Sequence, residues 1–378
     1  MRQSAESAVV LGVLLYLAGP LHAEGTFDLV GTHPDAAAQP TSIGKVLAAL
    51  SAFNGKIYAG FGDYDTNTGP IGIRAFDPAT NTFGPRLLNS PTEAIYQFRQ
   101  IGGKLYAPDI DPTTSQSGGY AVGTASGASE TWQHKAPVAA VHIFDIADYG
   151  GSLWMAGAQN NNAMVWRSTD NGTTWGTSLS VTPSGGYSFV RIYGMGVLDN
   201  RLYVNVDAEA SKSRVFDGTA WFDGPDLTPG GGYMANAGTF AGSLIYQSFQ
   251  GAGTPSKMYR FDGTSASSIA NGTLLDQFYD YKIVGDRMYG LIPEFVLIPG
   301  SWVQLQGVVV KWTDNLVEWH TLATAPITSR SLAILGDQLF IGATNAQVYQ
   351  YSDPVPEPAG LSLLALAGLA AIRRRKAS

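Results

Sequence analysis

Residues 53–58 read Phe-Asn-Gly-Lys-Ile-Tyr, and six further segments of the chain follow the same pattern. These segments are Ile101–Tyr106, Tyr149–Trp154, Leu198–Tyr203, Phe240–Ile245, Val284–Tyr289 and Leu335–Phe340. Each reads as the end of one strand, a two-residue turn and the start of the next strand. Asn-Gly, Gly-Gly, Asp-Asn and Gly-Asp suit turns that need positive φ, and such turns match the twist of a β-hairpin. The pattern therefore predicts seven hairpins.

The spacing of these hairpins predicts the fold. The second turn residues, at positions 55, 103, 151, 200, 242, 286 and 337, are 48, 48, 49, 42, 44 and 51 residues apart. A period near 47 is typical of a four-stranded propeller blade. A β-sandwich would not repeat one hairpin so regularly, and the coils of a β-helix are much shorter. We predict an all-β, seven-bladed β-propeller over residues 24–353.

The two ends of the repeat region predict how the ring closes. The last repeat stops at Asp353, one strand short of a full blade, whereas Thr26–Val30 precedes the first repeat and belongs to none. We expect this N-terminal segment to supply the missing outer strand of the last blade. Ring closure removes exposed strand edges, which otherwise template aggregation.

Composition limits the chemistry that is available to the chain. Among its 378 residues are 45 glycines and 20 prolines, as expected for many short strands and tight turns, but no cysteine. Disulfides, thiol nucleophiles, cysteine-ligated metals and a copper site built on a Cys–Tyr cross-link are therefore excluded. The formal net charge is −7, and it becomes −11 without the four basic residues at positions 373–376. An acidic body argues against nucleic-acid or anionic-lipid partners.

Residues 1–23 have the features of a secretory signal peptide. Arg2 supplies a positive charge, residues 8–18 are apolar, and Ala23 is a small residue at the expected cleavage site. An uncleaved anchor helix is the alternative. Both interpretations place the body of the protein outside the cytoplasm.

Residues 354–378 form a tail with three parts. Val355-Pro356-Glu357-Pro358 comes first, followed by an apolar run over residues 359–372 and the basic cluster Arg373-Arg374-Arg375-Lys376. As a helix the apolar run would span about 21 Å, which is short for a hydrocarbon core of about 30 Å. The adjoining basic residues are expected to stay on the cytoplasmic side.

This tail resembles the PEP-CTERM sorting signal. The resemblance covers only the last 24 residues, but all three parts occur in order. It implies transient inner-membrane anchoring through the C-terminal helix, cleavage near Pro-Glu-Pro by an exosortase-type sorting protease, and a secreted or cell-surface location in a biofilm matrix. A permanent C-terminal anchor is the alternative.

A second resemblance lies within the body. Ser168-Thr169-Asp170-Asn171-Gly172-Thr173-Thr174-Trp175 resembles the Asp-box of sialidase-like propellers, S-x-D-x-G-x-x-W. In that family the motif is a folding element between the third and fourth strands of a blade, so Ser168, Asp170, Gly172 and Trp175 are expected to have structural roles. The Gly-Gly hairpins are distantly similar to those of kelch propellers.

The loops after the second strand of each repeat hold the candidate ligand-binding residues. These are Asp63, Tyr64, Asp65, Asp109, Asp111, Asp207, Glu209, Glu294 and Trp302. If these loops open on one face, their carboxylates could bond sugar hydroxyls and their rings could stack on sugars. A weak Ca²⁺ site could form from the same oxygens. We identify no catalytic residue, no metal-binding histidine pair and no arginine triad of the sialidase type, and HExxH, GxSxG and phosphate-binding motifs do not occur.

Three functional hypotheses follow. The first is an exported, non-enzymatic surface or matrix protein that binds an exopolysaccharide or another envelope component through its loops. The second is a secreted glycan-active hydrolase or lyase that uses paired loop carboxylates. The third is a purely structural scaffold. The fold alone does not distinguish among these hypotheses, because propellers host many functions.

Overall fold

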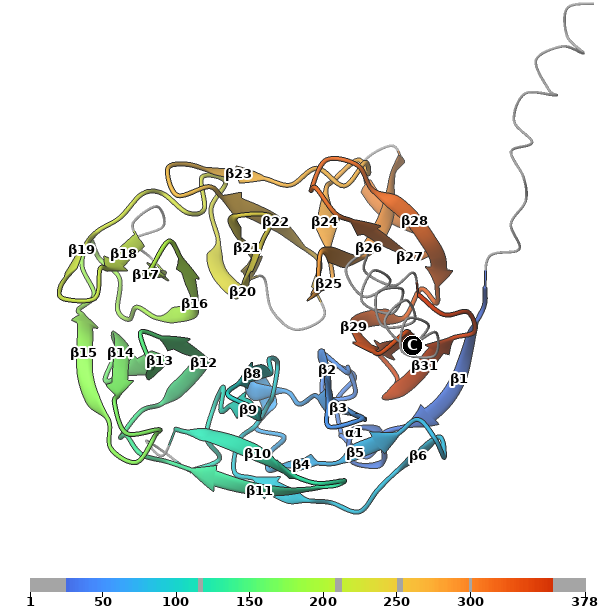
Figure 1. Ribbon diagram of the computed structural model, residues 1–378, viewed down its shortest axis with the longest axis horizontal. Helices are drawn as coiled ribbons and strands as arrows, with labels where there is room; N and C mark the ends of the chain where they lie inside the picture. Colours follow the sequence, from blue (N-terminus) through green and yellow to red (C-terminus); the bar gives the residue numbers. More distant parts are fainter. Residues whose placement is uncertain (1–24, 115–117, 208–212, 250–253, 299–300, 356–378) are drawn as a thin grey trace, which may run out of the picture.

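The computed structural model describes residues 25–114, 118–207, 213–249, 254–298 and 301–355. Their strands form seven antiparallel blades of four strands each, arranged in a ring (Figure 1); we call the axial region that the inner strands surround the central channel. The predicted seven-bladed β-propeller is therefore confirmed. The signal peptide, including Ala23, and the tail from Pro356 onward lie outside the described residues.

Each blade runs from an innermost strand beside the channel to an outermost strand at the rim. In that order, the first blade consists of β2 (Ala49–Phe53), β3 (Lys56–Gly60), β5 (Ala75–Asp77) and β6 (Thr82–Phe83). The second consists of β8 (Arg99–Ile101), β9 (Lys104–Pro108), β10 (Tyr120–Ser126) and β11 (Ser129–Lys135). The third consists of β12 (His142–Tyr149), β13 (Ser152–Gln159), β14 (Asn162–Ser168) and β15 (Gly176–Val181). The next two are β16 (Ile192–Leu198), β17 (Arg201–Val206), β18 (Ser213–Phe216) and β19 (Trp221–Asp223); and β20 (Tyr233–Phe240), β21 (Ser243–Phe249), β22 (Ser256–Phe261) and β23 (Ala266–Ser268).

The sixth and seventh blades complete the ring. They are β25 (Asp280–Val284), β26 (Arg287–Ile298), β27 (Ser301–Thr313) and β28 (His320–Ala325); and β29 (Ser329–Leu335), β30 (Gln338–Ala343), β31 (Gln347–Tyr351) and β1 (Phe27–Thr32). The remaining elements are the helices α1 (Pro34–Ala37) and η1 (Tyr64–Thr66), the strand pair β4 (Ile71–Ile73) and β7 (Leu88–Ser90), and β24 (Gln277–Phe278), which pairs with β22. Within the described ranges, no helix is long and apolar enough to cross a membrane.

The repeated two-residue turns lie between the first and second strands of every blade. Their first residue has positive φ in all seven, and in the turns of the first five blades the second residue does as well. In the last two blades only the glycine has positive φ, as in type II′ turns. Ala241, with φ 47°, is the one first-position residue that is neither Gly, Asn nor Asp.

The ring closes as the sequence predicts. β1 pairs with β31 in antiparallel register, with Phe27 opposite Tyr351, and Ser352 N donates to Thr26 O at 2.8 Å. After β31 the chain continues to Val355, whose side chain is buried and whose N–H donates to Asp337 O at 2.8 Å. The described chain therefore ends against the turn between β29 and β30.

Aromatic side chains fill the spaces between neighbouring blades. Trp154, on β13, is fully buried, and its ring centroid lies 5.0 Å from that of Phe216 on β18 of the next blade. Phe76 and Phe340 make a similar contact at 6.2 Å between the first and seventh blades. Such rings bury a large apolar area, and pairs at these separations add about 0.5–1.5 kcal/mol.

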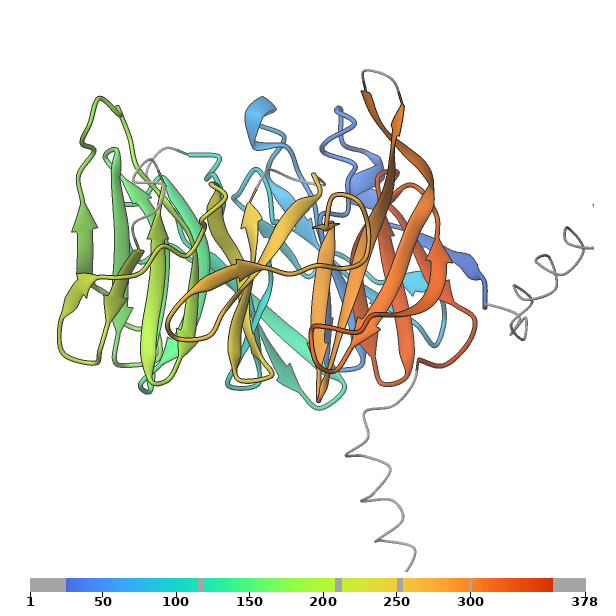
Figure 2. The same ribbon diagram turned by 90° about the horizontal axis from the view of Figure 1, so that it is seen from above.

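The ring has two unlike faces. We call the face that carries the seven repeated turns the hairpin face. The opposite one, the loop face, carries the connections from second to third strands and from each blade to the next. Figure 2 shows both faces from the side, with the long β26–β27 hairpin projecting beyond the loop face.

Candidate functional site

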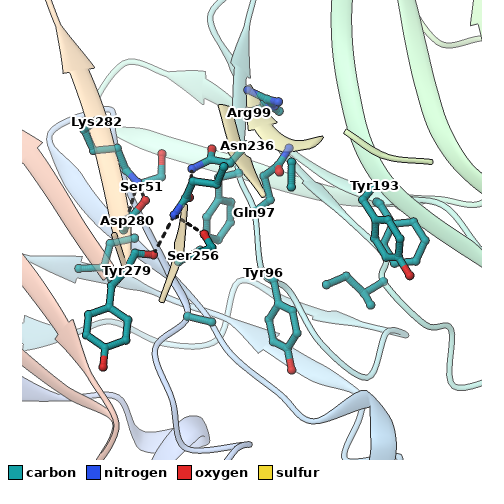
Figure 3. A pocket seen from close by; sticks show the side chains of 18 of the residues that line it. Ser51, Tyr96, Gln97, Arg99, Tyr193, Asn236, Ser256, Tyr279, Asp280 and Lys282 are labelled. Atoms are coloured by element: carbon teal, nitrogen blue, oxygen red, sulfur yellow. Dashed lines mark hydrogen bonds and ion pairs between the residues drawn. The ribbon is translucent and has the colours of Figure 1, made fainter. Parts of the chain in front are cut away.

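The central channel holds a cavity of about 320 Å³, which we call the central cavity (Figure 3). Its lining comes from the inner strands of several blades and from the residues just before them. Ser51 lies on β2, Arg99 on β8, Asn236 on β20 and Lys282 on β25. Residues far apart in the sequence therefore meet at the axis.

Arg99 crosses the channel. Its Nε and Nη2 atoms donate to the two carboxylate oxygens of Asp145, both at 2.8 Å, and its Nη1 donates to the carbonyl of Ala237. Asp145 lies on the third blade and Ala237 on the fifth. Gln97, beside Arg99, also donates to Asp145. The guanidinium charge is thus fully compensated inside the channel.

The second cation of the central cavity is also paired. Lys282 Nζ lies 2.7 and 2.9 Å from the two oxygens of Asp280. The other polar side chains that line the cavity are neutral: Asn236 donates to Gln247 at 3.1 Å, and Gln247 lies 3.4 Å from Ser256. The central cavity is consequently polar but carries no uncompensated charge among these groups.

Aromatic rings form a band beside the central cavity. Phe144 stacks on His142 at 5.2 Å and contacts Tyr193 at 4.5 Å, and Tyr193 stacks on Tyr233 at 4.8 Å. Phe144 and Tyr193 both line the cavity. Because these rings come from the inner strands of three successive blades, the packing of neighbouring blades brings them together.

Three of the predicted loop carboxylates are buried and hold backbone in place. Asp63 accepts hydrogen bonds from Thr41 Oγ1 at 2.7 Å and Asp65 N at 3.2 Å, and so caps η1. Asp109 is fully buried and bonds His134 Nε2 at 2.6 Å. Asp207 accepts from the backbone N–H of Arg191. Burial raises the pKa of both Asp109 and Asp207.

Asp111 is a predicted carboxylate that is partly exposed and lies close to a histidine. Its side chain is 28% exposed, and one of its oxygens lies 3.8 Å from His142 Nδ1. Burial raises the pKa of Asp111 to about 6, and burial lowers that of His142 to about 4. At neutral pH His142 is therefore uncharged, and its Nδ1–H donates to Ile110 O at 2.7 Å.

Glu93 is a carboxylate that the sequence pattern did not single out. Its backbone N–H donates to Asp111 O at 2.7 Å. Burial and then the charge of Asp111 raise the pKa of Glu93 to about 7. With its amide nitrogen facing Glu93, Asn67 donates to both carboxylate oxygens, at 2.8 and 2.9 Å. Glu93 lies in the connection between the first and second blades, whereas the candidates were predicted in loops after second strands. For Glu294 and Trp302 that prediction was wrong, because β26 and β27 extend through this segment as one long hairpin.

The other predicted candidates are spread more widely. Tyr64 contacts Tyr96 at the central cavity with ring centroids 5.9 Å apart, and Asp65 is exposed beside it. Glu294 is half-buried on β26, and Trp302 lies on β27 opposite Leu297. Glu209 lies outside the described residues. Among the residues that are described, no group of three or more histidine and carboxylate side chains could hold a metal ion.

Residues 168–175 form the turn between β14 and β15. Ser168 Oγ donates to Asp170 at 2.8 Å and accepts from Gly172 N at 2.8 Å, while Asp170 accepts from Thr174 N at 2.8 Å. Gly172 has φ 80°. These contacts are all within the turn, so they give Ser168 and Asp170 a local structural role.

Comparison with solved structures finds other propellers. Virginiamycin B lyase from Staphylococcus aureus superposes with a TM-score of 0.54 at 10% identity, over 82% of this chain and 95% of that one. The GH74 xyloglucanase from Xanthomonas campestris gives 0.51 at 14% identity, over 86% of this chain and 53% of that one. No protein-family model and no curated protein sequence matches the chain. At these identities the likeness shows the fold alone.

Proposed function

We propose that this protein is an exported, non-enzymatic binding protein whose central cavity takes an uncharged sugar unit of a polysaccharide. The observation that carries the proposal is the pairing of both lining cations, Arg99 with Asp145 and Lys282 with Asp280. A cavity with compensated charge offers little to an anion. Its amides and hydroxyls can exchange hydrogen bonds with sugar hydroxyls.

The size and lining of the central cavity support a small polar ligand. Its volume of about 320 Å³ is at the lower end of the range of about 300–1,000 Å³ that is typical of small-molecule sites. Tyr96, Phe144 and Tyr193 provide ring surfaces beside the amides of Asn236 and Gln247. A neutral glycan requires this combination, because rings can stack on the faces of a sugar and amides can hydrogen-bond its hydroxyls.

The proposed location rests on the two ends of the sequence. The secretory features of residues 1–23 and the PEP-CTERM-like tail with Arg373, Arg374 and Arg375 support export, with an exosortase-type protease as the processing partner. An exported, sugar-binding propeller fits a place in an extracellular polysaccharide matrix.

A glycan-active enzyme is the second candidate, and one observation favours it. The pKa of Glu93 is raised to about 7 and that of its neighbour Asp111 to about 6. Carboxyl groups with raised pKa values near a cavity are typical of general acids and bases. Glu93 is only 5% exposed, so substrate would reach Asp111 first.

Binding to a panel of neutral and anionic polysaccharides, with products monitored in the same samples, tests the proposal. Gln247→Leu keeps side-chain volume but removes the amide that bonds Asn236. We expect neutral glycans to bind the wild type, and Gln247→Leu to weaken binding at least tenfold. Phe222→Ala is the matched control, because this exposed ring on β19 does not line the cavity.

The other outcomes decide between the candidates. Binding of anionic polysaccharides alone would contradict the neutral-sugar proposal. Release of products would favour the enzyme, and Asp111→Asn should then abolish turnover. No binding and no turnover would leave the scaffold hypothesis.

A further inference from the structure

A second cavity, which we call the outer cavity, lies on the loop face between the third and fourth blades. It measures about 210 Å³ and is lined by Gln159, Asn160 and Asn161 from the β13–β14 turn, and by Phe189 and Arg191 from the connection into β16. Val190 N donates to Asn161 O at 2.9 Å, which joins the two segments. The amides and the aromatic ring here resemble the lining of the central cavity in kind, and Arg191 adds a guanidinium group that lies over the Phe189 ring.

One exposed aromatic ring, that of Phe189, lines the outer cavity, and a second, that of Tyr187, lies two residues earlier in the same connection. Tyr187 is 54% exposed and Phe189 46% exposed. The guanidinium of Arg191 lies over the Phe189 ring, 4.7 Å from its centroid, and holds the orientation of that ring. A ligand that covers such exposed rings would remove their apolar surface from water, which favours binding.

The aromatic band connects the two cavities. His142 lines the outer cavity and stacks on Phe144, which lines the central cavity. Arg191 and Tyr193, two residues apart at the start of β16, likewise line one cavity each. The two cavities therefore share a wall of stacked rings, in which His142 and Phe144 are buried and Tyr193 is partly exposed.

We propose that the outer cavity is a second sugar subsite, and that the two cavities bind successive units of one neutral polysaccharide chain. This inference rests on the proposed function of the central cavity. It adds that the ligand is a chain of several units, and that Tyr187 and Phe189 stack on the units beyond the central cavity.

The test measures affinity against chain length. The probes are ladders of one to eight sugar units, prepared from β-1,4-glucan, β-1,3-glucan, galactomannan and α-mannan, and titrated by calorimetry against the full chain. For the wild type we expect affinity to rise at least tenfold between the shortest bound oligosaccharide and the longest. Tyr187→Ala with Phe189→Ala should remove that rise and leave binding of the shortest oligosaccharide unchanged.

Controls separate this inference from the proposal on which it rests. Gln247→Leu should weaken short and long probes alike, whereas Leu274→Ala, a change at an exposed residue that lines neither cavity, should affect none. If affinity does not depend on length, or if the Tyr187 and Phe189 changes leave long probes unaffected, the outer subsite is wrong and the central site stands. If no ladder binds at any length, both are wrong.

Discussion

Asp145 and Asp280 occupy similar places on the inner strands of the third and sixth blades. Asp145 accepts the backbone N–H of Ile146, its own neighbour, and that of Met195 on the next blade, both at 2.8 Å. Asp280 accepts those of Tyr281 at 2.8 Å and Leu332 on the next blade at 2.9 Å. Each aspartate therefore joins two neighbouring blades at the channel wall.

The cation that compensates each aspartate comes from a different place. Asp145 is paired with Arg99, which lies on the preceding blade and reaches on to Ala237, so this network links four blades. Asp280 is paired with Lys282 on its own strand, and that network links two blades. The backbone contacts of the two aspartates are thus alike, whereas the ion pair is local at Asp280 and spans the channel at Asp145.

The largest effect is expected from Asp145→Ala. The Asp145 side chain is fully buried, and its loss leaves the Arg99 charge uncompensated and Met195 N–H without its acceptor. Breaking a buried ion pair in this way costs about 3–5 kcal/mol. Urea unfolding monitored by tryptophan fluorescence measures the change in the free energy of unfolding. A loss below about 1 kcal/mol would show that the four-blade network contributes little.

Asp280→Ala should cost less, about 1–3 kcal/mol, because it leaves Leu332 N–H unsatisfied. The side chain of Lys282 is 29% exposed and can turn toward water once its partner is lost. The same unfolding measurement compares the two variants directly. Equal losses at Asp145 and Asp280 would contradict the distinction between the networks.

Arg99→Met tests whether the charge pair or the backbone contacts dominate at Asp145. The variant keeps much of the side-chain length but removes the ion pair and the contact with Ala237. We expect a loss of about 1–3 kcal/mol, because Asp145 retains its backbone donors. A double-mutant cycle with Asp145→Asn should give a coupling energy above about 1 kcal/mol. Additive effects would mean that the two side chains act independently.

The smallest effect is expected from Lys282→Met. Asp280 keeps both backbone donors, and a partly exposed ion pair contributes about 0–1 kcal/mol. The unfolding midpoint should stay close to that of the wild type. A loss as large as that of Arg99→Met would indicate that the local pair is as important as the cross-channel pair.

The sequence predicted the architecture of the molecule well. Seven turns at a near-constant spacing indicated seven blades, and the unassigned segment at Thr26–Val30 indicated closure by β1 (Phe27–Thr32). The candidate site was predicted less well. Asp63 and Asp109 belong to the predicted loops, yet they are buried and bond neighbouring backbone and side chains. Glu93 and the channel residues Arg99 and Asn236 were not singled out.

The turns were easier to predict than the cavity because they depend on residues adjacent in the sequence, whereas the cavity depends on residues far apart in it. A two-residue turn is decided by local backbone sterics, so pairs such as Asn54-Gly55, with φ of 49° and 74°, can be read from the sequence alone. The central cavity requires Arg99 and Ala237, 138 residues apart, to meet across the channel. That meeting depends on the closure of the ring and on how each inner strand directs its side chains. Only the tertiary structure decides these, because no local preference specifies which side chains face the axis.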